Sequence, residues 1–513
     1  MRNVAPGPRP GHLWRTFWGY PLYLALSLAL GALVFVPRVH AYFVSDDWPV
    51  LLRNMHVSWQ EVPHWFAGMR FGWYRPLFDV FVSLCWRWFG LSPAAYRVTS
   101  IVLCSIVSAN VGAVARLLTQ DRLAGLAATV LFATSASHAE PVLWYAASNE
   151  LLAGSLVSTG MVSYILFRRG RGRPWFVACL LCCFGALASK ETSLAFPPIL
   201  LVYDVLYPSR QERRSVRFLL PSLTLVALGI VFALLRVPQD SAYSVHVTAP
   251  RLLLNLAYYA FVGVFALPSN YAVQASLPLW RTSPVLPVAA LTVSCGALAT
   301  AAWIGIRARA QEPLCSHKRA LLFCTAWAVG AIVPVIPIVA ERTVYLSSLG
   351  IAMGLGIAFV GAYRTLKADQ RRARAIVAIA AVVYAVVSLS VLRYRCAIWG
   401  KASETSEAIL MEVRGKLPGL PPDCRVVALN IPDNIEYAYV FRNAFPAAAE
   451  VLEYDRVVEA WPDWELNVLG IETKSEAIGQ LAQGPHTVAY WYDGGVLRLE
   501  RDSCGRAVEQ GGP

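Results

Sequence analysis

Two adjacent carboxylates, Asp46 and Asp47 in the stretch Ser45-Asp46-Asp47-Trp48, follow shortly after the first long apolar run of the chain. Acidic side chains beside the hydrocarbon of a membrane are costly unless they are paired or functional, so this position indicates a site. A carboxylate there can act as a general base on a hydroxyl group. Two alternatives stay open: a solvated interfacial loop, and a pair of ligands for a divalent cation.

Further ionisable side chains stand in short polar segments between apolar runs. Singly, each has a structural explanation: His138 can cap a helix, and Lys190 with Glu191, or Glu341 with Arg342, can form a local ion pair. Gathered on one side of a membrane they favour a site, because acids supply a general base while Arg and Lys bind phosphate. The candidate binding residues are Arg75, His138, Glu140, Asn149, Glu150, Lys190, Glu191, Glu341, Arg342 and Tyr345.

The composition is that of a polytopic membrane protein. Of 513 residues, 57% are hydrophobic and only 15% are charged, and the mean hydropathy is +0.49. Residues 396–513 hold 10 Lys+Arg and 18 Asp+Glu, a net charge of −8, so residues 1–395 carry the remaining 35 and 14, a net charge of +21. The positive charge therefore belongs to the membrane part, and we expect no nucleic-acid partner.

Basic residues concentrate in short loops near 168–173, 210–217, 307–319 and 364–374, which should therefore be cytoplasmic. The alternate loops should face outward, with the amino terminus inside, the carboxyl terminus outside, and the plasma (inner) membrane as the location. We read the run Leu252–Leu267 as an interfacial or re-entrant helix on the outer side. Eleven crossings are expected, at about 17–37, 96–118, 122–137, 143–167, 174–188, 193–207, 217–236, 285–306, 320–339, 344–363 and 375–394.

The expected fold is an all-α polytopic membrane domain over residues 1–395, with a long first outer loop at about 38–95, and a small extracytoplasmic α/β domain over residues 396–513. In the second domain, buried strands are predicted at Val426–Asn430 and Thr487–Trp491, each followed by turn residues. Helices are predicted at Glu404–Lys416 and Ser475–Gln483. An oxidising compartment would allow a disulfide between Cys424 and Cys504.

The ordered set of these segments resembles a family. Asp46-Asp47, Tyr74-Arg75-Pro76-Leu77, His138-Ala139-Glu140, Ser189-Lys190-Glu191-Thr192 and Ala340-Glu341-Arg342 run in the same order as in GT-C membrane glycosyltransferases. The closest likeness is to the transmembrane and tetratricopeptide-repeat O-mannosyltransferases and their bacterial relatives, over about residues 40–365. The sequence departs from that pattern at Ser135, where the family has a His, and in a carboxyl-terminal domain without repeats.

The resemblance implies a polyprenyl-phosphate sugar donor and an inverting transfer on the outer face of the membrane. Asp46 would be the general base, and Asp47 would bind the acceptor or raise the proton affinity of its neighbour. His138 and Glu140 would line the sugar or acceptor pocket. Arg342, together with Lys190, would hold the lipid phosphate. The departures leave the acceptor open among a secreted protein, a cell-wall polymer and a glycolipid.

The same residues also bear on two alternative functions, a transporter or flippase and a non-catalytic scaffold. A guanidinium can hold the anionic leaving group of such a transfer through two hydrogen bonds. The sequence contains no Gly-rich phosphate-binding loop, so a nucleotide is not indicated. A transporter or flippase should carry ionisable groups near the middle of its helices, where this sequence has few. A non-catalytic scaffold for envelope glycan assembly is the other alternative, and replacing Asp46 would separate it from an enzyme. No cofactor is indicated, apart from the divalent cation left open above.

Overall fold

The computed structural model describes most of the chain. The described residues are 19–70, 72–208, 216–235, 255, 259, 315–335, 340–366, 370–456, 458–471, 473–481 and 486–504. The expected crossing at 285–306 lies outside them. So does the expected helix Leu252–Leu267, except for Asn255 and Tyr259.

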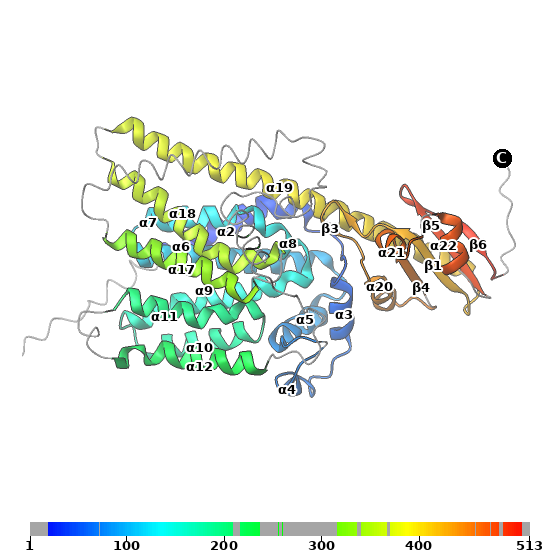
Figure 1. Ribbon diagram of the computed structural model, residues 1–513, viewed down its shortest axis with the longest axis horizontal. Coiled ribbons are helices and arrows are strands. Elements are labelled where there is room, and N and C mark those ends of the chain that lie inside the picture. The colour runs from blue at the N-terminus through cyan, green and yellow to red at the C-terminus, as the bar shows by residue number, and fades with distance from the viewer. Residues whose placement is uncertain are drawn as a thin grey trace, which may run out of the picture.

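A bundle of apolar helices forms the larger part of the molecule (Figure 1). Six helical segments of the described chain are long and apolar enough to cross a membrane, and three shorter apolar helices accompany them. Apart from the crossing at 285–306, each of the ten remaining expected crossings coincides with a helix. These are α2 (Tyr20–Phe35), α6 (Pro93–Thr119), α7 (Arg122–Ala133), α9 (Ser148–Arg168), α10 (Arg173–Leu187), α11 (Phe196–Leu206), α12 (Leu220–Leu235), α17 (Cys315–Ile332), α18 (Tyr345–Thr365) and α19 (Arg371–Lys416). The protein is thus a multi-pass, mostly helical membrane protein.

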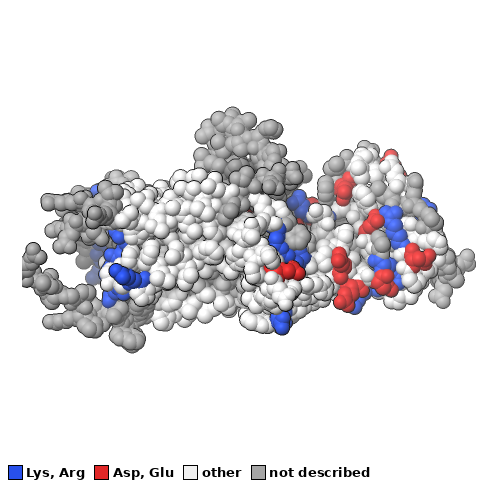
Figure 2. All heavy atoms as spheres, turned by 90° about the horizontal axis from the view of Figure 1, so that it is seen from below, with Lys and Arg blue, Asp and Glu red and all other residues white. Residues whose placement is uncertain are grey.

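Small residues allow the helices of the bundle to approach closely. A Cβ at Gly112 of α6 would lie 2.8 Å from the carbonyl oxygen of Gly125 in α7, and one at Gly125 would lie 2.7 Å from that of Gly112. Such contacts bring backbones together where no hydrophobic effect drives association. On the face shown in Figure 2, a broad zone without charged side chains separates a basic end of the molecule from an end that carries both signs.

The polar segments that hold the candidate residues lie at one end of the bundle. The long segment at about 38–95 folds into α3 (Asp47–Met55), α4 (Val62–Trp65) and α5 (Pro76–Phe89). Short helical turns precede or join the long helices at the same end, so side chains far apart in sequence come together. These turns are η2 (Ala136–His138), α8 (Ala139–Leu143), η3 (Tyr145–Ala147), η4 (Glu191–Ala195) and η9 (Arg342–Val344).

A small mixed-sheet domain follows the last helix. The sheet has the order β4-β1-β5-β6, in which β1 pairs in parallel with β4 and β5, and β5 pairs antiparallel with β6. Both predicted strands are confirmed, and so is the Cys424–Cys504 disulfide. The elements are β1 (Arg425–Ile431), β2 (Asn434–Ile435), β3 (Ala438–Tyr439), α20 (Phe445–Val451), β4 (Val458–Pro462), α21 (Asp463–Val468), α22 (Lys474–Leu481), β5 (Thr487–Asp493) and β6 (Val496–Asp502).

The two parts of the chain are joined by one helix. The 46-residue α19 runs without a break from the bundle to the mixed sheet (Figure 1). The predicted helix Glu404–Lys416 is therefore the end of α19, because no proline interrupts the sequence before Pro418. The expected domain boundary at 395–396 falls inside this helix. In addition, α20 packs against α3, which places the carboxyl-terminal domain beside the acidic pair.

Candidate functional site

The segment that carries the acidic pair is fixed from several sides. The hydroxyl groups of Ser403 and Ser406 on α19 donate hydrogen bonds to the backbone oxygens of Tyr42 (3.2 Å) and Phe43 (2.9 Å). Ser45 has a positive φ of 45°, a conformation that a non-glycine residue seldom adopts. Tertiary contacts hold this turn, so that Asp46 stands at the beginning of α3.

Asp47 is fully buried, and both of its carboxylate oxygens are occupied. Oδ1 accepts from the backbone N–H of Ala146 at 2.7 Å, and Oδ2 accepts from that of Val44 at 3.1 Å. The Arg97 guanidinium, also buried, lies 3.7 Å from Oδ2. Burial raises the pKa of Asp47 to about 6, against the opposing effect of Arg97. These contacts tie the first outer loop to the second and favour a supporting role for Asp47.

Asp46 differs from its neighbour in exposure and in its bonded partners. Its side chain is partly exposed, and within the described residues its carboxylate makes no hydrogen bond or ion pair. Partial burial raises the pKa of Asp46, while three arginines, Arg342, Arg442 and Arg53, act in the opposite direction. A carboxylate that is poorly solvated, unpaired and faced by cations can accept a proton and can sit beside an anion.

Arg342, one of the arginines that lower the pKa of Asp46, is paired with a second acid. One guanidinium nitrogen of Arg342 is 2.7 Å from Oε1 of Glu140, and the Arg342 backbone N–H donates to Oε2 at 2.9 Å. The guanidinium also lies over the Trp144 ring, 4.9 Å from its centroid. The structure thus brings Glu140 and Arg342 together as expected, with the guanidinium held in orientation by Glu140 and Trp144.

A third group of charges forms around Lys190. Its Nζ is 3.5 Å from Glu150 and 4.0 Å from Glu191. Arg75 holds Glu191 through two parallel hydrogen bonds of 2.9 Å. Burial, and next the nearby Arg75, lower the pKa of Lys190 to about 8, and Arg342 contributes in the same direction. Lys190 and Arg342 therefore act on one another electrostatically, which connects this group to the Glu140–Arg342 pair.

Other candidates have positions that support the fold. His138 is fully buried between the Phe132 and Tyr345 rings, with Nε2 3.2 Å from the Ser348 hydroxyl. Burial lowers the pKa of His138 to about 3, so the ring is neutral at pH 7. Asn149 is also buried and donates to the backbone oxygen of Ala146 at 3.0 Å. None of these three candidates, His138, Tyr345 and Asn149, meets Asp46 through a contact in the described structure.

Glu341 does not pair with its neighbour Arg342. It forms a buried ion pair with Arg395 of α19, and Arg395 in turn lies over the Tyr437 ring of the carboxyl-terminal domain, 4.9 Å from its centroid. Adjacent residues in a helical turn point in different directions, so each carboxylate and guanidinium finds a partner on another element. The local ion pair that Glu341 and Arg342 could form by sequence is therefore replaced by two pairs with other elements, and Glu341 joins α19 to the bundle.

Several charged residues of this region were not expected from the sequence. They are Arg53, Arg97, Arg395 and Arg442. Arg97 and Arg395 border apolar runs, and a buried arginine there demands an acidic partner, a signal that sequence reading can use. Arg442 carries no such signal, because it lies in the soluble part of the chain.

The groups around the acidic pair suit an anion better than a metal ion. Among the described residues, no group of three or more His, Cys, Asp or Glu side chains could hold a metal ion. Asp47 has no free oxygen to offer, and the arginines that face Asp46 would repel a divalent cation.

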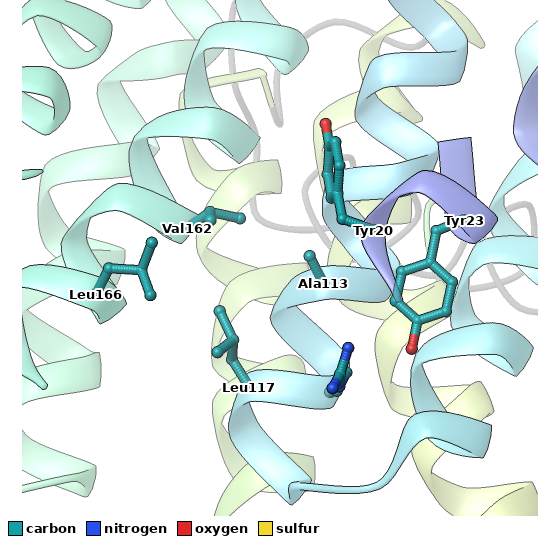
Figure 3. A pocket seen from close by; sticks show the side chains of 7 residues that line it. Tyr20, Tyr23, Ala113, Leu117, Val162 and Leu166 are labelled. Atoms are coloured by element: carbon teal, nitrogen blue, oxygen red, sulfur yellow. The ribbon is translucent and has the colours of Figure 1, made fainter. Parts of the chain in front are cut away.

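A small cavity elsewhere does not fit a lipid-linked sugar. It lies between Tyr20 and Tyr23 of α2 and residues of α6 and α9, including Leu117 and Leu166 (Figure 3). Because it meets the beginning of α2 and the end of α9, it lies at the opposite end of the bundle from Asp46. Its volume of about 30 Å³ has room for little more than water.

Similarity to known proteins is distant. No protein-family model matches the chain. The protein O-mannosyl-transferase Tmtc1 of Drosophila melanogaster is 28% identical over 204 residues, which cover 37% of this chain and 23% of that protein. The chain therefore matches under a quarter of the length of this relative. The predicted resemblance to the O-mannosyltransferases is confirmed as a distant similarity in sequence.

Solved structures also show a distant similarity to this one. ArnT from Cupriavidus metallidurans bound to undecaprenyl phosphate has 15% identity and a TM-score of 0.40, with 92% of each chain covered. The archaeal oligosaccharyltransferase AglB from Archaeoglobus fulgidus, in complex with an inhibitory peptide and a dolichol-phosphate, has 13% identity and a TM-score of 0.47, with 93% of this chain and 70% of that chain covered. Both TM-scores are below 0.5, too low to transfer a site between chains.

Proposed function

We propose that the protein is a GT-C membrane glycosyltransferase that moves a sugar from a polyprenyl-phosphate carrier to an acceptor hydroxyl, with inversion at the anomeric carbon. Asp46 carries the proposal, as the one carboxylate of the described site that has no bonded partner and yet faces cations. The distant similarity to an O-mannosyl-transferase supports this reaction class and favours a hexose of the mannosyl type. The acceptor is a protein or glycan that bears a free hydroxyl group.

In the proposed reaction the acceptor oxygen attacks the anomeric carbon of the donor. The new carbon–oxygen bond forms as the bond to the phosphate oxygen breaks, and the electron pair of that bond stays on the polyprenyl phosphate. Asp46 takes the proton from the acceptor hydroxyl, which requires hydrogen-bond reach between them. Asp47 does not exchange protons in this scheme; it keeps Asp46 in position through the contacts with Val44, Ala146 and Arg97.

The leaving phosphate requires cationic groups at the same place. Arg342 is suitable, because Glu140 occupies only one nitrogen of its guanidinium side chain and 27% of the side chain remains exposed. The planar guanidinium can donate two parallel hydrogen bonds to the oxygens of a phosphate. Lys190 would add a second charge, and Glu150 and Glu191 hold it in place. Lewis-acid help from a divalent cation is not part of the scheme, since arginines already surround the carboxylate.

The charge pattern supports an outward-facing site in the plasma membrane. Basic residues stand at the other end of the bundle, at the end of α9 and of α18 and the beginning of α19. By the excess of positive charge in cytoplasmic loops, that end would face the cytoplasm. A reporter that is active only in the cytoplasm, fused after Arg501, should then be silent, and a strong signal would overturn this orientation.

The decisive experiment replaces Asp46 with Asn, which keeps size and polarity but removes the charge. Purified protein in liposomes would be supplied with radiolabelled polyprenyl-phosphate mannose and membranes from cells that lack the protein as the acceptor source. Transfer should fall by about 10²-fold or more, the usual contribution of a general base. Glu61→Gln, at an exposed acid of the same outer loop, should transfer at the wild-type rate.

The rival functions predict other results. A scaffold, or a transporter without chemistry, would transfer no label even in the wild type. Transfer by Asp46→Asn at the wild-type rate would show that another group takes the proton. Unfolding of the Asp46→Asn protein, seen as a lower melting temperature than that of Glu61→Gln, would instead assign Asp46 a structural role.

A further inference from the structure

The carboxyl-terminal domain reaches the acidic pair directly. The backbone N–H of Ser45 donates to the oxygen of Val440 at 2.7 Å, so a strand-to-helix connection of the soluble domain lies against the residue next to Asp46. Val440 is fixed in turn by a 2.7 Å bond from its N–H to the oxygen of Asp433. The segment 433–442 therefore has a defined position over the beginning of α3.

Aromatic rings extend this contact to the proposed phosphate-binding residue. Tyr439 lies against Trp144, with 5.3 Å between ring centroids, and Trp144 is the ring beneath Arg342. Trp144 also stacks on Trp399 of α19 at 5.9 Å. Tyr439 of the carboxyl-terminal domain thus reaches Arg342 of the bundle through the single ring of Trp144.

Arg442 stands at the end of the segment 433–442. Its guanidinium lies over the Tyr439 ring, 4.5 Å from the centroid, and Nε is 3.8 Å from the Asp433 carboxylate. The side chain is 49% exposed, so this pairing is loose. Arg442 also has a positive φ of 49°, a conformation that costs free energy in a non-glycine residue and that often marks functional sites.

We propose that Arg442 is a positioning residue of the acid site: the soluble domain holds this guanidinium opposite Asp46, so that docking of the domain keeps the carboxylate ionised. This rests on the proposed function for its catalytic consequence, and on the contacts of segment 433–442 for its geometry. The carboxyl-terminal domain would then be part of the reaction centre instead of an appended acceptor-presenting unit.

The electrostatics of the site agree with this role. Partial burial raises the pKa of Asp46, and Arg342, Arg442 and Arg53 each lower it. Asp47, the adjacent acid, is buried against Arg97. Among the three arginines that face Asp46, Arg442 has the weakest partner, because its nearest acid is 3.8 Å away, against 2.7 Å for Arg342 and 2.9 Å for Arg53.

The first test measures the rate of transfer against pH for Arg442→Gln in the liposome assay. Without the guanidinium, Asp46 should hold its proton to higher pH, so the acidic limb of the profile moves upward. The rate near pH 5.5 should fall roughly threefold or more relative to its own plateau, because only ionised Asp46 can accept a proton. Arg442→Lys should restore the wild-type profile, since it keeps the charge.

Arg498→Gln is the matched control. Arg498 belongs to the same domain, its side chain is 65% exposed, and it lies 3.5 Å from Asp493. It shares the loose pairing of Arg442 but not its position beside Ser45. Its profile should equal that of the wild type, whereas a shift equal to that of Arg442→Gln would assign the effect to the net charge of the domain and overturn the proposal.

The second test does not need catalysis. In Asp46→Cys, the introduced thiol reports the potential at this position, because nearby cations favour the reactive thiolate. Alkylation by iodoacetamide at pH 7, followed on the peptide that contains residue 46 by mass spectrometry, should slow by about threefold or more when Arg442→Gln is added. Addition of Arg498→Gln should leave the alkylation rate unchanged.

Together the two tests separate the inference from the proposed function. A wild-type protein that transfers no sugar refutes the function, while the thiol measurement still decides whether Arg442 acts at position 46. Active wild-type protein, with an unshifted profile and unchanged alkylation in Arg442→Gln, refutes the role of Arg442 alone. A shift in both measurements establishes it.

Discussion

Replacing Asp47 with Asn should damage the protein in a different way from replacing Asp46. Asn is close in size to Asp, but it leaves the buried Arg97 without its counter-charge and turns a hydrogen-bond donor toward groups that also donate. The Asp46 carboxylate forms no hydrogen bond or ion pair within the described structure. The same chemical change at neighbouring positions should therefore separate folding from catalysis.

The size of the effect follows from burial. Arg97 and Asp47 have side chains that are 1% and 0% exposed, so their pair belongs to the interior. Removing one partner from a buried ion pair costs about 3–5 kcal/mol, because the remaining charge stays unsolvated. Native proteins are stable by only about 5–15 kcal/mol, so Asp47→Asn should lose a large share of its stability. Arg97→Met added to Asp47→Asn should recover part of it.

Thermal unfolding can be followed with a thiol-reactive fluorogenic dye in detergent, because six cysteines are buried in the fold and become reactive on unfolding: Cys85, Cys104, Cys179, Cys183, Cys324 and Cys396. Asp47→Asn should melt well below the wild type, whereas Asp46→Asn should melt at the wild-type temperature. The reasoning would be refuted by an Asp47→Asn protein that melts at the wild-type temperature yet transfers no sugar. That result would restore Asp47 to the reaction itself.

Two further predictions concern Lys190 and the disulfide. Burial lowers the pKa of Lys190 to about 8, so Lys190 is charged below that pH and neutral above it. The rate of transfer in the liposome assay should therefore fall above pH 8. Lys190→Arg should keep its rate at pH 9, because arginine stays charged. The Cys424–Cys504 bond spans a sequence separation of 80, so Cys424→Ala should cost about 4 kcal/mol in the entropic model, measured as a lower melting temperature that reductant reproduces in the wild type but not in the variant.

Much of the fold could be predicted because membrane helices follow hydropathy. Apolar runs of near-spanning length marked each of the ten helices that the structure describes at expected crossings, and turn residues marked strands β1 and β5. The continuity of α19 could not be predicted, because the drop in hydropathy after residue 395 looks like a domain boundary. A helix that leaves the membrane needs no break in its backbone when polar residues simply replace apolar ones.

The position of the candidate residues in the fold could be predicted, but their pairings could not. Short polar segments placed the candidate residues at one end of the bundle, since loops at one end converge whatever their order in the sequence. Which acid meets which cation depends on rotations of helices that no local pattern reports. Glu341 thus pairs with Arg395 and Glu140 with Arg342, although Glu341 and Arg342 are neighbours in the sequence.

Each of the arginines that act on Asp46 has an acid of its own nearby. The pairs are Arg53 with Asp79, Arg342 with Glu140, and Arg442 with Asp433. Glu140 and Asp79 hold Arg342 and Arg53 closely, at 2.7 Å and 2.9 Å, whereas Asp433 holds Arg442 loosely, at 3.8 Å. Asp46 is then the one carboxylate of this set without a fixed partner, and it can change its protonation state without breaking a bond that the fold requires. The proposed general base requires these properties: poor solvation, so that it accepts a proton readily, and nearby cations, so that it is unprotonated when the acceptor arrives.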